Sequence, residues 1–389
     1  MSTLKLKKGV IKSIHSNMKM VLGVLILALF STLTATAQTV VKDKDSGMPV
    51  GFATVVDEQG LFLGQTDASG LMPDLKDSKM FRITHVAYES IRDSVSHLGT
   101  ELLLTPADLN LGEVVKVKGK PYCLRLTGYL RDYSILGHEV TIMKQKVEPV
   151  WKYYDHVGEL YMFYDGKDSK WIDIAVRDAV TGEAPKRKPY VSIRLKTRSI
   201  VEGLKKSANN PKLVGKGDVQ QIVNCDSVVG SIVRDKDNKM IRVDYDAMAP
   251  DTIQVINAII AKLRIYSDQR NYIYRMGDTD HVSQADLAIY KCNRHNRMKL
   301  FGWDIDLYDF DEFYVDRVDC LSKDEYKAAV KEVKARRKSK KPQMTMEEID
   351  QYMAKLHVEP ISDELKQLLK ISAQMKAERE KTRSDECRP

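Results

Sequence analysis

The sequence predicts a mainly β protein with an α-helical C-terminal region: a small seven-stranded β-sandwich followed by a larger curved antiparallel sheet domain. Three observations predict this fold class. Short apolar segments separated by turn residues fill residues 38–119. Alternation of apolar and polar residues with a period of two dominates residues 122–320, and helical spacing of apolar residues replaces it in residues 321–389.

Length and composition set the first limits. A chain of 389 residues accommodates two or three domains, and 43% hydrophobic residues suffice for ordinary packed cores. Charged residues make up 30% of the chain, which argues against an integral membrane protein.

Residues 1–37 have the organisation of a secretory signal peptide. Five lysines precede a short apolar run, residues 21–30, and the small-residue sequence TATAQ follows it. This pattern is typical of a signal peptide, here cleaved after Ala37, and the run is shorter than the about 20 residues that a membrane span needs. No cysteine lies at the cleavage point, which argues against a lipid anchor. The long basic start leaves three methionines open as the first residue, Met1, Met18 and Met20.

The charge of the mature chain is small. The formal net charge of +8 includes the five lysines of residues 1–37, so the mature chain carries +8 − 5 = +3. A mildly positive protein of this size has no electrostatic basis for binding nucleic acid. A local basic excess lies in Lys323 to Lys341, with nine basic and three acidic residues. Such a segment is either the solvated face of a helix and its exit loop or a peripheral contact with an anionic membrane surface.

The cysteines do not form a recognisable framework. Their odd number and wide spacing differ from a disulfide scaffold, and pairing cannot be read from sequence. Cys292 and His295 have the spacing of half a metal site, but no second half follows at a usable distance. The five cysteines are Cys123, Cys225, Cys292, Cys320 and Cys387.

The first module contains seven short segments of strand character between residues 39 and 118. Several short strands at regular spacing predict two small antiparallel sheets packed face to face. The segments are TVVK (39–42), FATVV (52–56), LFLGQT (61–66), MFRIT (80–84), IRDSV (91–95), TELLL (100–104) and EVVKV (113–117).

The motif GQTDASG, residues 64–70, lies at one of the corners between these strands. Asp67 is placed to accept hydrogen bonds from backbone amides two or three residues later, and Gly70 can take the positive φ that ends a turn. A calcium loop needs several more oxygen ligands at close spacing, which Ala68 and Ser69 do not supply. The motif therefore predicts a structural corner.

Four pieces of this module, in order, carry a resemblance to a known family. They are SGMPVGFATV (46–55), GQTDASG (64–70), HVAYES (85–90) and TPADLNLGEVVKVKGK (105–120). Together they resemble the carboxypeptidase regulatory-like domain, a transthyretin-like β-sandwich of Gram-negative cell-envelope proteins. Ala87 stands where glycine is usual in that family. The resemblance implies a structural or binding module that accompanies other domains and is not itself a peptidase.

Period-two alternation in residues 122–320 predicts one large antiparallel sheet, packed on one side and wet on the other. Residues 204–218 are predicted to be a loop, and a short helix is predicted from Ala249, capped by Asp251. The expected strand segments are 123–136, 157–164, 170–176, 190–201, 238–248, 262–275 and 287–310.

Two further likenesses concern this middle region. Residues 228–250 and 310–327 resemble the second domain found behind regulatory-like modules in exported envelope proteins. A curved sheet over a helix is also similar, at the level of fold alone, to the half-barrels of lipoprotein carriers.

After Leu321 the pattern is helical. Ser322 with Glu325, and Thr345 with Glu348, have the spacing of capping boxes. Two apolar stripes follow, which predict packing on the protein's own surface or on a partner. The first consists of Met346, Ile349, Tyr352, Met353 and Leu356, and the second of Leu365, Leu368, Leu369 and Met375.

The sharpest enzymatic lead is His156 and Glu159, with His281 far downstream. Metallocarboxypeptidases bind zinc through an H-x-x-E motif and a distant histidine, which leaves a position for water. The surrounding stretch is rich in strand residues, and the accessory module comes first here but follows the catalytic domain in those enzymes. A zinc-dependent hydrolase therefore remains only the weaker alternative.

A second lead consists of carboxylates at Asp304, Asp306, Asp309 and Asp311. Paired carboxylates can act as acid and base or hold calcium, but alternating acids on a strand more simply form a solvated face. We expect His85, His97 and His138 to be structural or exposed. No nucleophile elbow, phosphate-binding loop or H-E-x-x-H motif occurs.

These observations predict an exported, non-catalytic envelope protein with a binding or scaffolding role, in the periplasm or at the outer membrane of a Gram-negative bacterium. The first alternative is a carrier of a lipid or another apolar ligand, held on the concave side of the middle sheet, and the second is the zinc hydrolase. The sequence assigns no catalytic residue, cofactor or metal, and it does not identify the ligand-binding residues or the partner.

Overall fold

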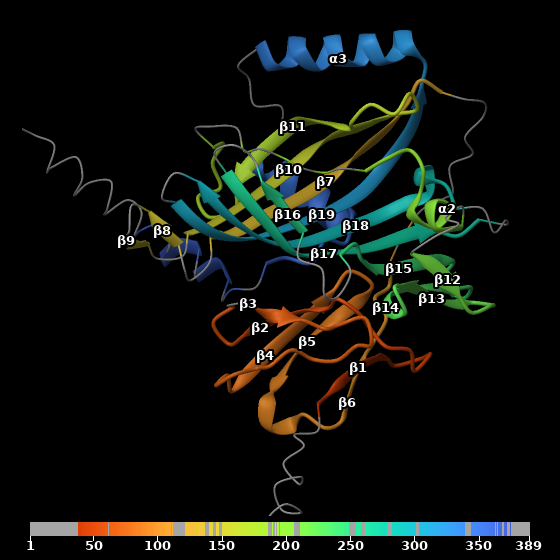
Figure 1. Ribbon diagram of the computed structural model, residues 1–389. Coiled ribbons are helices and arrows are strands. Elements are labelled where there is room, and N and C mark those ends of the chain that lie inside the picture. Colours follow the sequence, from red (N-terminus) through yellow and green to blue (C-terminus); the bar gives the residue numbers. More distant parts are fainter. Residues whose placement is uncertain are drawn as a thin grey trace, which may run out of the picture. The chain divides into compact units, whose positions relative to one another are not determined.

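The computed structural model in Figure 1 describes residues 38–60, 62–109, 111, 121–136, 140–142, 145–147, 150–185, 189, 191, 193, 195–205, 211–248, 254–257, 261–277, 282–300, 303–338, 344–361, 363, 365–367, 369–371 and 374. The chain divides into two compact units, residues 1–39 and 40–389, and every strand and helix below belongs to the second. The structure confirms a mainly β protein with a large antiparallel sheet. In the part of the chain that the structure describes, no helix is both long and apolar enough to cross a bilayer.

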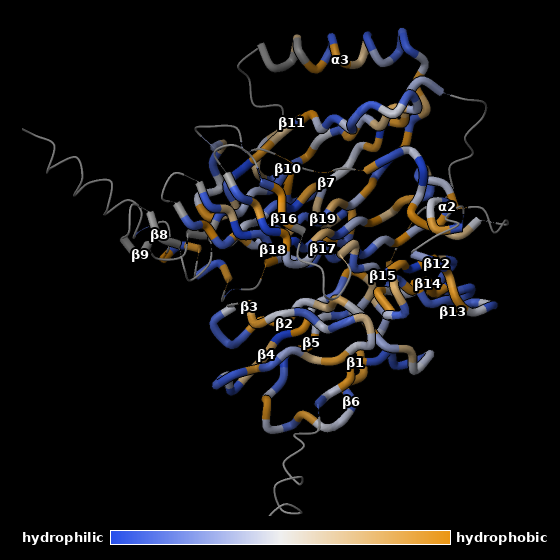
Figure 2. Tube along the Cα trace, in the orientation of Figure 1, coloured by the Kyte–Doolittle hydropathy of each residue, from blue (hydrophilic) through white to orange (hydrophobic). Residues whose placement is uncertain are grey.

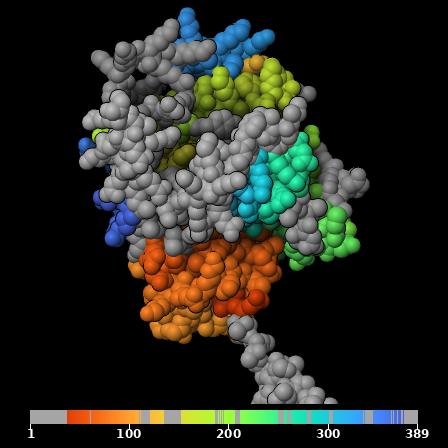
Figure 3. Space-filling view, turned by 60° about the vertical axis from the view of Figure 1, so that its left-hand side comes forward, coloured from red at the N-terminus to blue at the C-terminus, as the bar shows by residue number. Residues whose placement is uncertain are grey.

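The first module, defined here as residues 40–111, contains six strands within its described residues. Four of them form an antiparallel sheet in the order β3-β2-β4-β5, while β1 pairs with β6. Figure 3 shows the surface of this module as a contiguous block of orange atoms. The strands are β1 (Val40–Asp43), β2 (Thr54–Asp57), β3 (Phe62–Gln65), β4 (Met80–His85), β5 (Tyr88–Ser94) and β6 (Glu101–Leu104), and a 3-10 turn, η1 (Val95–His97), follows β5.

The pairing of β1 with β6 corrects one expectation. The two strands run parallel, with Val40 beside Glu101 and Asp43 beside Leu104, whereas the sequence predicted two antiparallel sheets. A parallel pair needs a long crossover connection. The four-stranded sheet supplies it, because all four of its strands lie between β1 and β6 in the chain. The expected seventh strand, at 113–117, lies outside the described residues.

The GQTDASG motif is a corner, as the sequence predicted. Asp67 Oδ1 accepts hydrogen bonds from the backbone N–H groups of Ser69 and Leu71, each at 2.9 Å. Gly70 has a φ of 78°, and a Cβ there would lie 2.4 Å from the Val41 carbonyl oxygen, so only glycine fits. The Thr66 hydroxyl is fully buried; it accepts from the N–H of residue 53 at 2.9 Å and donates to the carbonyl of residue 50 at 2.8 Å.

The large sheet contains thirteen strands among the described residues, and all its pairings are antiparallel. Its main order is β11-β10-β7-β19-β18-β17-β15-β14-β13-β12; β16 pairs with β17, and β8 pairs with β19 and β9. The strands are β7 (Cys123–Leu136), β8 (Val140–Ile142), β9 (Gln145–Val147), β10 (Val150–Phe163), β11 (Lys170–Asp178), β12 (Lys212–Val214), β13 (Val219–Asn224), β14 (Ser227–Asp235), β15 (Met240–Asp246), β16 (Gln254–Asn257), β17 (Ala261–Arg275), β18 (Leu287–Leu300) and β19 (Trp303–Leu321).

Three local expectations in this region were wrong. The short helix predicted from Ala249 is absent from the described residues, where β16 and the start of β17 form a hairpin instead. Residues Val255 and Ile256 are β-branched and favour a strand. The strand predicted at 190–201 is not formed by its described residues, and a six-residue helix, α2 (Ile200–Lys205), begins there. Within the predicted loop 204–218, β12 pairs with β13.

The long strands bend where the register shifts. Two of these shifts lie between Val157 and Gly158 on β10, and between Val315 and Arg317 on β19. Bulges of this kind increase the local twist of a strand. Gly158 and Gly128 are direct partners across β10 and β7, between these two bulges. A Cβ on Gly128 would lie 2.0 Å from the Tyr314 carbonyl oxygen, so glycine is required for this close approach.

The large sheet has two faces with different neighbours. The face that carries Ile273 and Ile289, called the module face, packs against the first module's core, which includes Val55 and Ile83. The opposite face carries an apolar cluster that includes Leu130 and is covered by Val201 and Leu204 of α2. Figure 2 shows orange and blue segments alternating along the strands, as expected where successive side chains point to opposite faces.

Two helices follow the sheet, α3 (Lys323–Lys338) and α4 (Met346–Lys355). Both predicted capping boxes are confirmed: Ser322 N–H donates to Glu325 at 2.7 Å, and Thr345 N–H donates to Glu348 at 2.6 Å. Tyr326 and Val333 of α3 pack beside Tyr161 of the sheet. In the α4 stripe Ile349 is fully buried. Leu369 of the second stripe is buried, while residues 368 and 375 lie outside the described part.

Candidate functional site

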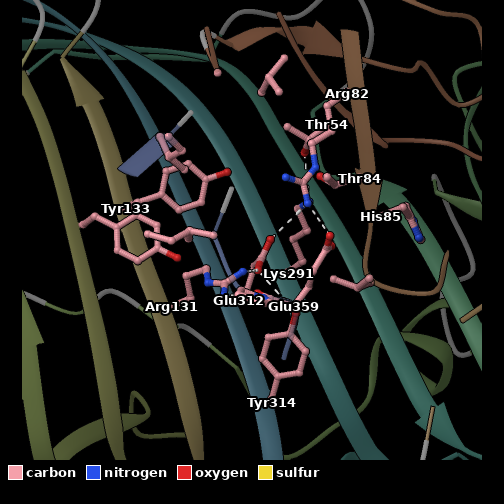
Figure 4. Close-up of a pocket in the computed structure, with 17 residues that line it drawn as sticks. Thr54, Arg82, Thr84, His85, Arg131, Tyr133, Lys291, Glu312, Tyr314 and Glu359 are labelled. Atoms are coloured by element: carbon pink, nitrogen blue, oxygen red, sulfur yellow. Dashed lines mark hydrogen bonds and ion pairs between the residues drawn. The ribbon is translucent and has the colours of Figure 1, made fainter. Parts of the chain in front are cut away.

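A cavity of about 110 Å³ lies between the first module and the module face of the large sheet (Figure 4). Strands β2 and β4 of the module form one wall, and β7, β10, β18 and β19 form the other. The segment 359–361, beyond α4, also contributes. Its charged and aromatic lining residues are Arg82, His85, Arg131, Tyr133, Tyr153, Lys291, Glu312, Tyr314 and Glu359.

Lys291 and Glu312 form the buried centre of the cavity wall. They are direct partners across β18 and β19, so their side chains lie on the same face. Lys291 is 1% exposed; its Nζ donates to Thr54 Oγ1 at 3.0 Å and lies 3.5 Å from Glu312 Oε1. Burial lowers the pKa of Lys291, although Glu312 opposes that shift. Burial alone would raise the pKa of Glu312, but Lys291 and Arg131 lower it below its ordinary value.

Arg131 is the second cation that faces Glu312. Its register partner on β19 is Glu312, and Nη1 lies 3.3 Å from Oε2 of that carboxylate. Nη2 donates to the Glu359 carbonyl oxygen at 2.5 Å, whereas the buried Nε has no hydrogen-bond partner. The guanidinium carbon lies 5.9 Å from the centre of the Tyr153 ring. Arg131 thus joins the sheet to the segment after α4 and retains one unused donor.

Glu359 connects that segment to the first module. Its carboxylate accepts from Arg82 of β4 and, at 2.5 Å, from the Ser90 hydroxyl of β5. The Glu359 side chain is 47% exposed, so this contact lies at the outer side of the cavity. Figure 4 shows Arg82, Glu359, Glu312 and Lys291 grouped around the same space.

The balance of charge and ring surface determines what the cavity can hold. Three cations, Arg82, Arg131 and Lys291, line it against two carboxylates, Glu312 and Glu359. Three phenols add apolar surface and hydroxyl groups, and burial raises the pKa of each, so the phenols are neutral at pH 7. The lining therefore favours a small ligand with one anionic group and an apolar or aromatic part.

His85 lines the cavity with a buried side chain and joins the module to the sheet. Its Nδ1 accepts from the Ala87 N–H at 3.1 Å, so the proton of the neutral ring is on Nε2. Nε2 lies 3.4 Å from Asp244 Oδ1 and 3.1 Å from the Asn271 side-chain amide. Burial lowers the pKa of His85, although Asp244 opposes that shift. Both ring nitrogens thus face groups of the protein itself, as expected of a structural histidine.

The residues of the zinc hypothesis do not meet at one place among the described residues. His156 and Glu159 are three residues apart on β10, so their side chains point to opposite faces. His156 Nδ1 lies 3.0 Å from Asp173, whereas Glu159 accepts from the Tyr161 hydroxyl. His281 lies outside the described residues. No group of three potential metal ligands forms within the described part of the chain.

The aspartates of β19 correct another expectation, since they do not form a uniformly solvated face. Asp304 binds Arg297 at 2.8 Å, and Asp306 lies 2.7 Å from His295. Asp311 is 7% exposed and lies opposite Asp132 of β7 on the face away from the module. The burial of these aspartates could not be predicted from the sequence, because alternation alone does not tell which face of a sheet is covered by a second layer.

Cys292 and His295 have the spacing of half a metal site, but the sequence favours a buried or unpaired thiol, and Cys292 is buried and free. The two residues are three positions apart on β18, so their side chains lie on opposite faces. Burial raises the pKa of the Cys292 thiol to about 12, so it is a neutral thiol at pH 7. The exposed His97 lies 2.8 Å from Asp93, and residue 138 lies outside the described part. Cys123 and Cys320 carry free thiols, and residue 387 is not described.

Sequence reasoning missed the residues of the cavity. Lys291 lies in LAIYKCN and Arg131 in YLRDY, where alternation marks them as wet-face residues of strands. One signal in the sequence could have indicated Lys291. It is the only charge in the apolar first part of its strand, and a charge that is buried in such a segment nearly always has a partner of opposite charge. The partner, Glu312, is 21 residues away and is identified only by the register of the sheet.

Comparison with known proteins adds no identification. No family model matches the chain, and a search of curated proteins finds no match.

Proposed function

We propose that this chain is an exported, non-catalytic binding protein of the Gram-negative cell envelope, and that the cavity between its first module and its large sheet is the binding site. The observation that carries the proposal is the excess of one cation, beside three tyrosines, among the described residues that line the cavity. The proposed ligand is a small carboxylate with an aromatic or apolar part.

The contacts of the lining support binding more than catalysis. Lys291 and Glu312 lie 3.5 Å apart and are both buried, so each reduces the reactivity of the other. Glu359 is held by Arg82 and Ser90. A general base needs a carboxylate or imidazole free to take a proton, and the lining carboxylates already face cations.

The first module supports the assignment to an envelope protein. We propose that residues 38–119 form a carboxypeptidase regulatory-like sandwich with a seventh strand at 113–117, and the support is the resemblance of four sequence motifs between residues 46 and 120. Residues 1–37 have the pattern of a cleaved signal peptide. We also propose that residues 321–389 form a helical C-terminal region.

Binding is tested with benzoate as the anionic probe and benzamide as its neutral counterpart, by isothermal titration calorimetry. We expect benzoate to bind and benzamide to bind at least about tenfold more weakly. Arg131→Met should keep the fold, because Glu312 still faces Lys291, and should abolish benzoate binding. Arg198→Met, at an exposed arginine outside the cavity, is the matched control. Equal binding by the Arg131 variant and the wild type contradicts the proposal.

Export is tested by fractionation of the native host and N-terminal sequencing of the mature protein. We expect the chain in the periplasmic or outer-membrane fraction, with Gln38 as its first residue. Recovery in the cytoplasmic fraction, with residues 1–37 retained, contradicts export.

A peripheral membrane contact through the basic segment Lys323 to Lys341 remains a subsidiary proposal. Lys323, Lys327 and Lys331 of α3 are exposed, and its Tyr326 faces the sheet. Sedimentation with vesicles containing phosphatidylserine should carry the protein down at low salt and release it at high salt. Failure to sediment rejects the contact.

The alternative of an apolar-ligand carrier receives less support. Its binding surface would be the face of the sheet away from the module, where Val201 and Leu204 already cover the apolar cluster. Farther along that face lie Asp132, Asp268 and Asp311, which an apolar ligand would leave unsolvated.

A further inference from the structure

A second hollow of about 240 Å³ lies on the module face, beside the first cavity. Strand β3 of the first module forms one side, and β17, β18 and β19 of the large sheet form the other. The two hollows have no lining residue in common. The volume is many times the roughly 10–15 Å³ that one water molecule needs, so a small molecule fits.

The side chains of this groove are polar and mostly uncharged. Among the described residues, Gln65, Ser267, Gln269 and Asn293 line it and no carboxylate does. His295 lines it as well, with its Nε2 2.7 Å from Asp306 Oδ1. Arg294 also contributes to the lining, but by the alternation of β18 its side chain points to the other face of the sheet, where its Nε lies 3.6 Å from Asp268. Amide and hydroxyl side chains both donate and accept hydrogen bonds, so a cluster of them can bind a ligand that carries hydroxyl groups on neighbouring carbon atoms.

Asn293 supplies an independent indication of a ligand. It is 3% exposed, and its side-chain Nδ2 donates to Thr54 Oγ1 at 3.5 Å. Its buried Oδ1 accepts no hydrogen bond from the residues that the structure describes. An unsatisfied buried acceptor is energetically unfavourable, and a hydroxyl donor in the groove would remove that cost.

Aromatic rings form the remaining surface of the groove. Phe62 of β3 lies 5.3 Å from Tyr308 and 5.2 Å from Phe310 of β19, measured between ring centres. All three rings line the groove, so apolar C–H surface lies beside the amides. A ligand with C–H groups and hydroxyl groups in alternation fits both kinds of surface.

We propose that this groove binds a neutral carbohydrate. A sugar ring offers vicinal hydroxyls to Ser267, Gln269 and Asn293 and its C–H groups to Phe62 and Tyr308. A nucleic acid fits less well, because its phosphates need cations and Arg294 already faces Asp268. The absence of a lining carboxylate also leaves no counter-charge for a cationic ligand.

The test uses isothermal titration calorimetry with cellobiose, maltose, mannobiose and diacetylchitobiose as neutral probes. Oligothymidylate and inorganic phosphate serve as anionic probes. We expect at least one disaccharide to bind the full mature chain, and neither anionic probe to displace it. Failure of all four disaccharides to bind overturns the proposal, as does displacement by oligothymidylate.

Asn293→Leu separates a binding role from a structural one. Leucine removes the unsatisfied Oδ1 with little change of shape, so the melting temperature should stay equal or rise. The dissociation constant for the bound disaccharide should increase at least about tenfold. Gln221→Ala, at an exposed glutamine on β13, should leave affinity unchanged. Unchanged affinity in the Asn293 variant overturns the assignment. Benzoate binding in the first cavity should persist in this variant, so the two proposals fail separately.

Discussion

At Lys291 the chain places an ammonium group with 1% of its residue surface exposed, between the hydroxyl of Thr54 and the carboxylate of Glu312. The same carboxylate lies 3.3 Å from Arg131, so one anion serves two cations. Glu312 therefore contributes differently from the two cations, Lys291 and Arg131. Loss of the shared anion leaves two buried cations without it, whereas loss of either cation leaves the anion paired.

We therefore predict that Glu312→Gln destabilises the protein more than Lys291→Met. Breaking a buried pair by removing one partner typically costs about 3–5 kcal/mol, and we expect Glu312→Gln in that range and Lys291→Met near half of it. Lys236→Met removes an exposed pair with Asp218 and should cost less than about 1 kcal/mol. Urea unfolding followed by circular dichroism gives the three free energies. Equal losses for the two buried variants would refute the shared-anion arrangement.

The carboxyl pair Asp132 and Asp311 predicts a pH dependence. Burial and the facing acids raise the pKa of Asp132 to about 8 and that of Asp311 to about 7. The unfolded chain loses these protons near its ordinary carboxyl pKa of about 4. Between about pH 4 and pH 8 the folded state therefore binds more protons than the unfolded state, and stability falls as the pH rises. Lys152 and Arg294 oppose the shifts without reversing them.

Asp311→Asn tests this dependence directly, because it removes one charge and keeps the shape. We expect its melting temperature to exceed that of the wild type near pH 9 and to match it near pH 5. Asp306→Asn, at an acid that lies 2.7 Å from His295, is the comparison variant and should not gain stability at high pH. A wild-type melting temperature that rises steadily from pH 5 to pH 9 would disprove the assignment.

Among the elements, β7 depends on Gly128 for its approach to β19. A Cβ there would lie 2.0 Å from the Tyr314 carbonyl oxygen and 3.0 Å from the Phe313 ring, so a backbone shift is required. We predict that Gly128→Ala costs about 3 kcal/mol or more, at the upper end of overpacking changes. Gly203→Ala in α2 meets nothing within 4 Å and should be neutral or stabilising by up to about 1 kcal/mol. Chemical unfolding of both variants distinguishes a steric effect from a general intolerance of alanine.

Helix α4 begins at a capping box, and its contacts depend on that start. Thr345→Ala removes the acceptor for the Glu348 N–H and should cost about 1 kcal/mol, mostly within the helix. Faster amide exchange is expected in 346–355, and the contacts of Asp350 with Arg177 and of Tyr352 with Asp316 should weaken. Ser322→Ala, at the start of α3, provides a matched cap change elsewhere. If exchange in α4 is unaltered, the cap does not hold this helix.

For the whole molecule, the first module and the large sheet should unfold as one cooperative unit. Ile289 of the sheet is 5% exposed and packs in the same apolar cluster as Val55 and Ile83 of the module. Ile289→Ala should cost about 2–5 kcal/mol and lower the protection of both parts together. Fluorescence reports on the sheet, because Trp151, Trp171 and Trp303 all lie in it, and amide exchange reports on the module. Separate unfolding transitions of the first module and the large sheet in the wild type would refute the shared core.

Particular residues show which structural features could be predicted from the sequence. The Asp67 corner and the caps at Ser322 and Thr345 were predictable because each depends on hydrogen bonds within a few residues. The helix expected from residue 249 failed because Val255 and Ile256 fit either period over so short a run, and pairing with β17 decided the outcome. The faces of Asp311 and Lys291 were unreadable because alternation separates two faces without saying what covers each.

The sequence by itself determined the mainly β character, the long alternating strands and the local turns and caps, since these follow from side-chain period and short-range hydrogen bonding. Only the tertiary structure decided that Arg131, Lys291 and Glu312 lie together and that the first module covers them. Strand register and contacts between layers join residues that are far apart in the chain. A charge on a strand has the same sequence signature whether water or a second layer covers it. Whether such a charge is buried, and therefore whether it belongs to the candidate site, is decided only by the tertiary structure.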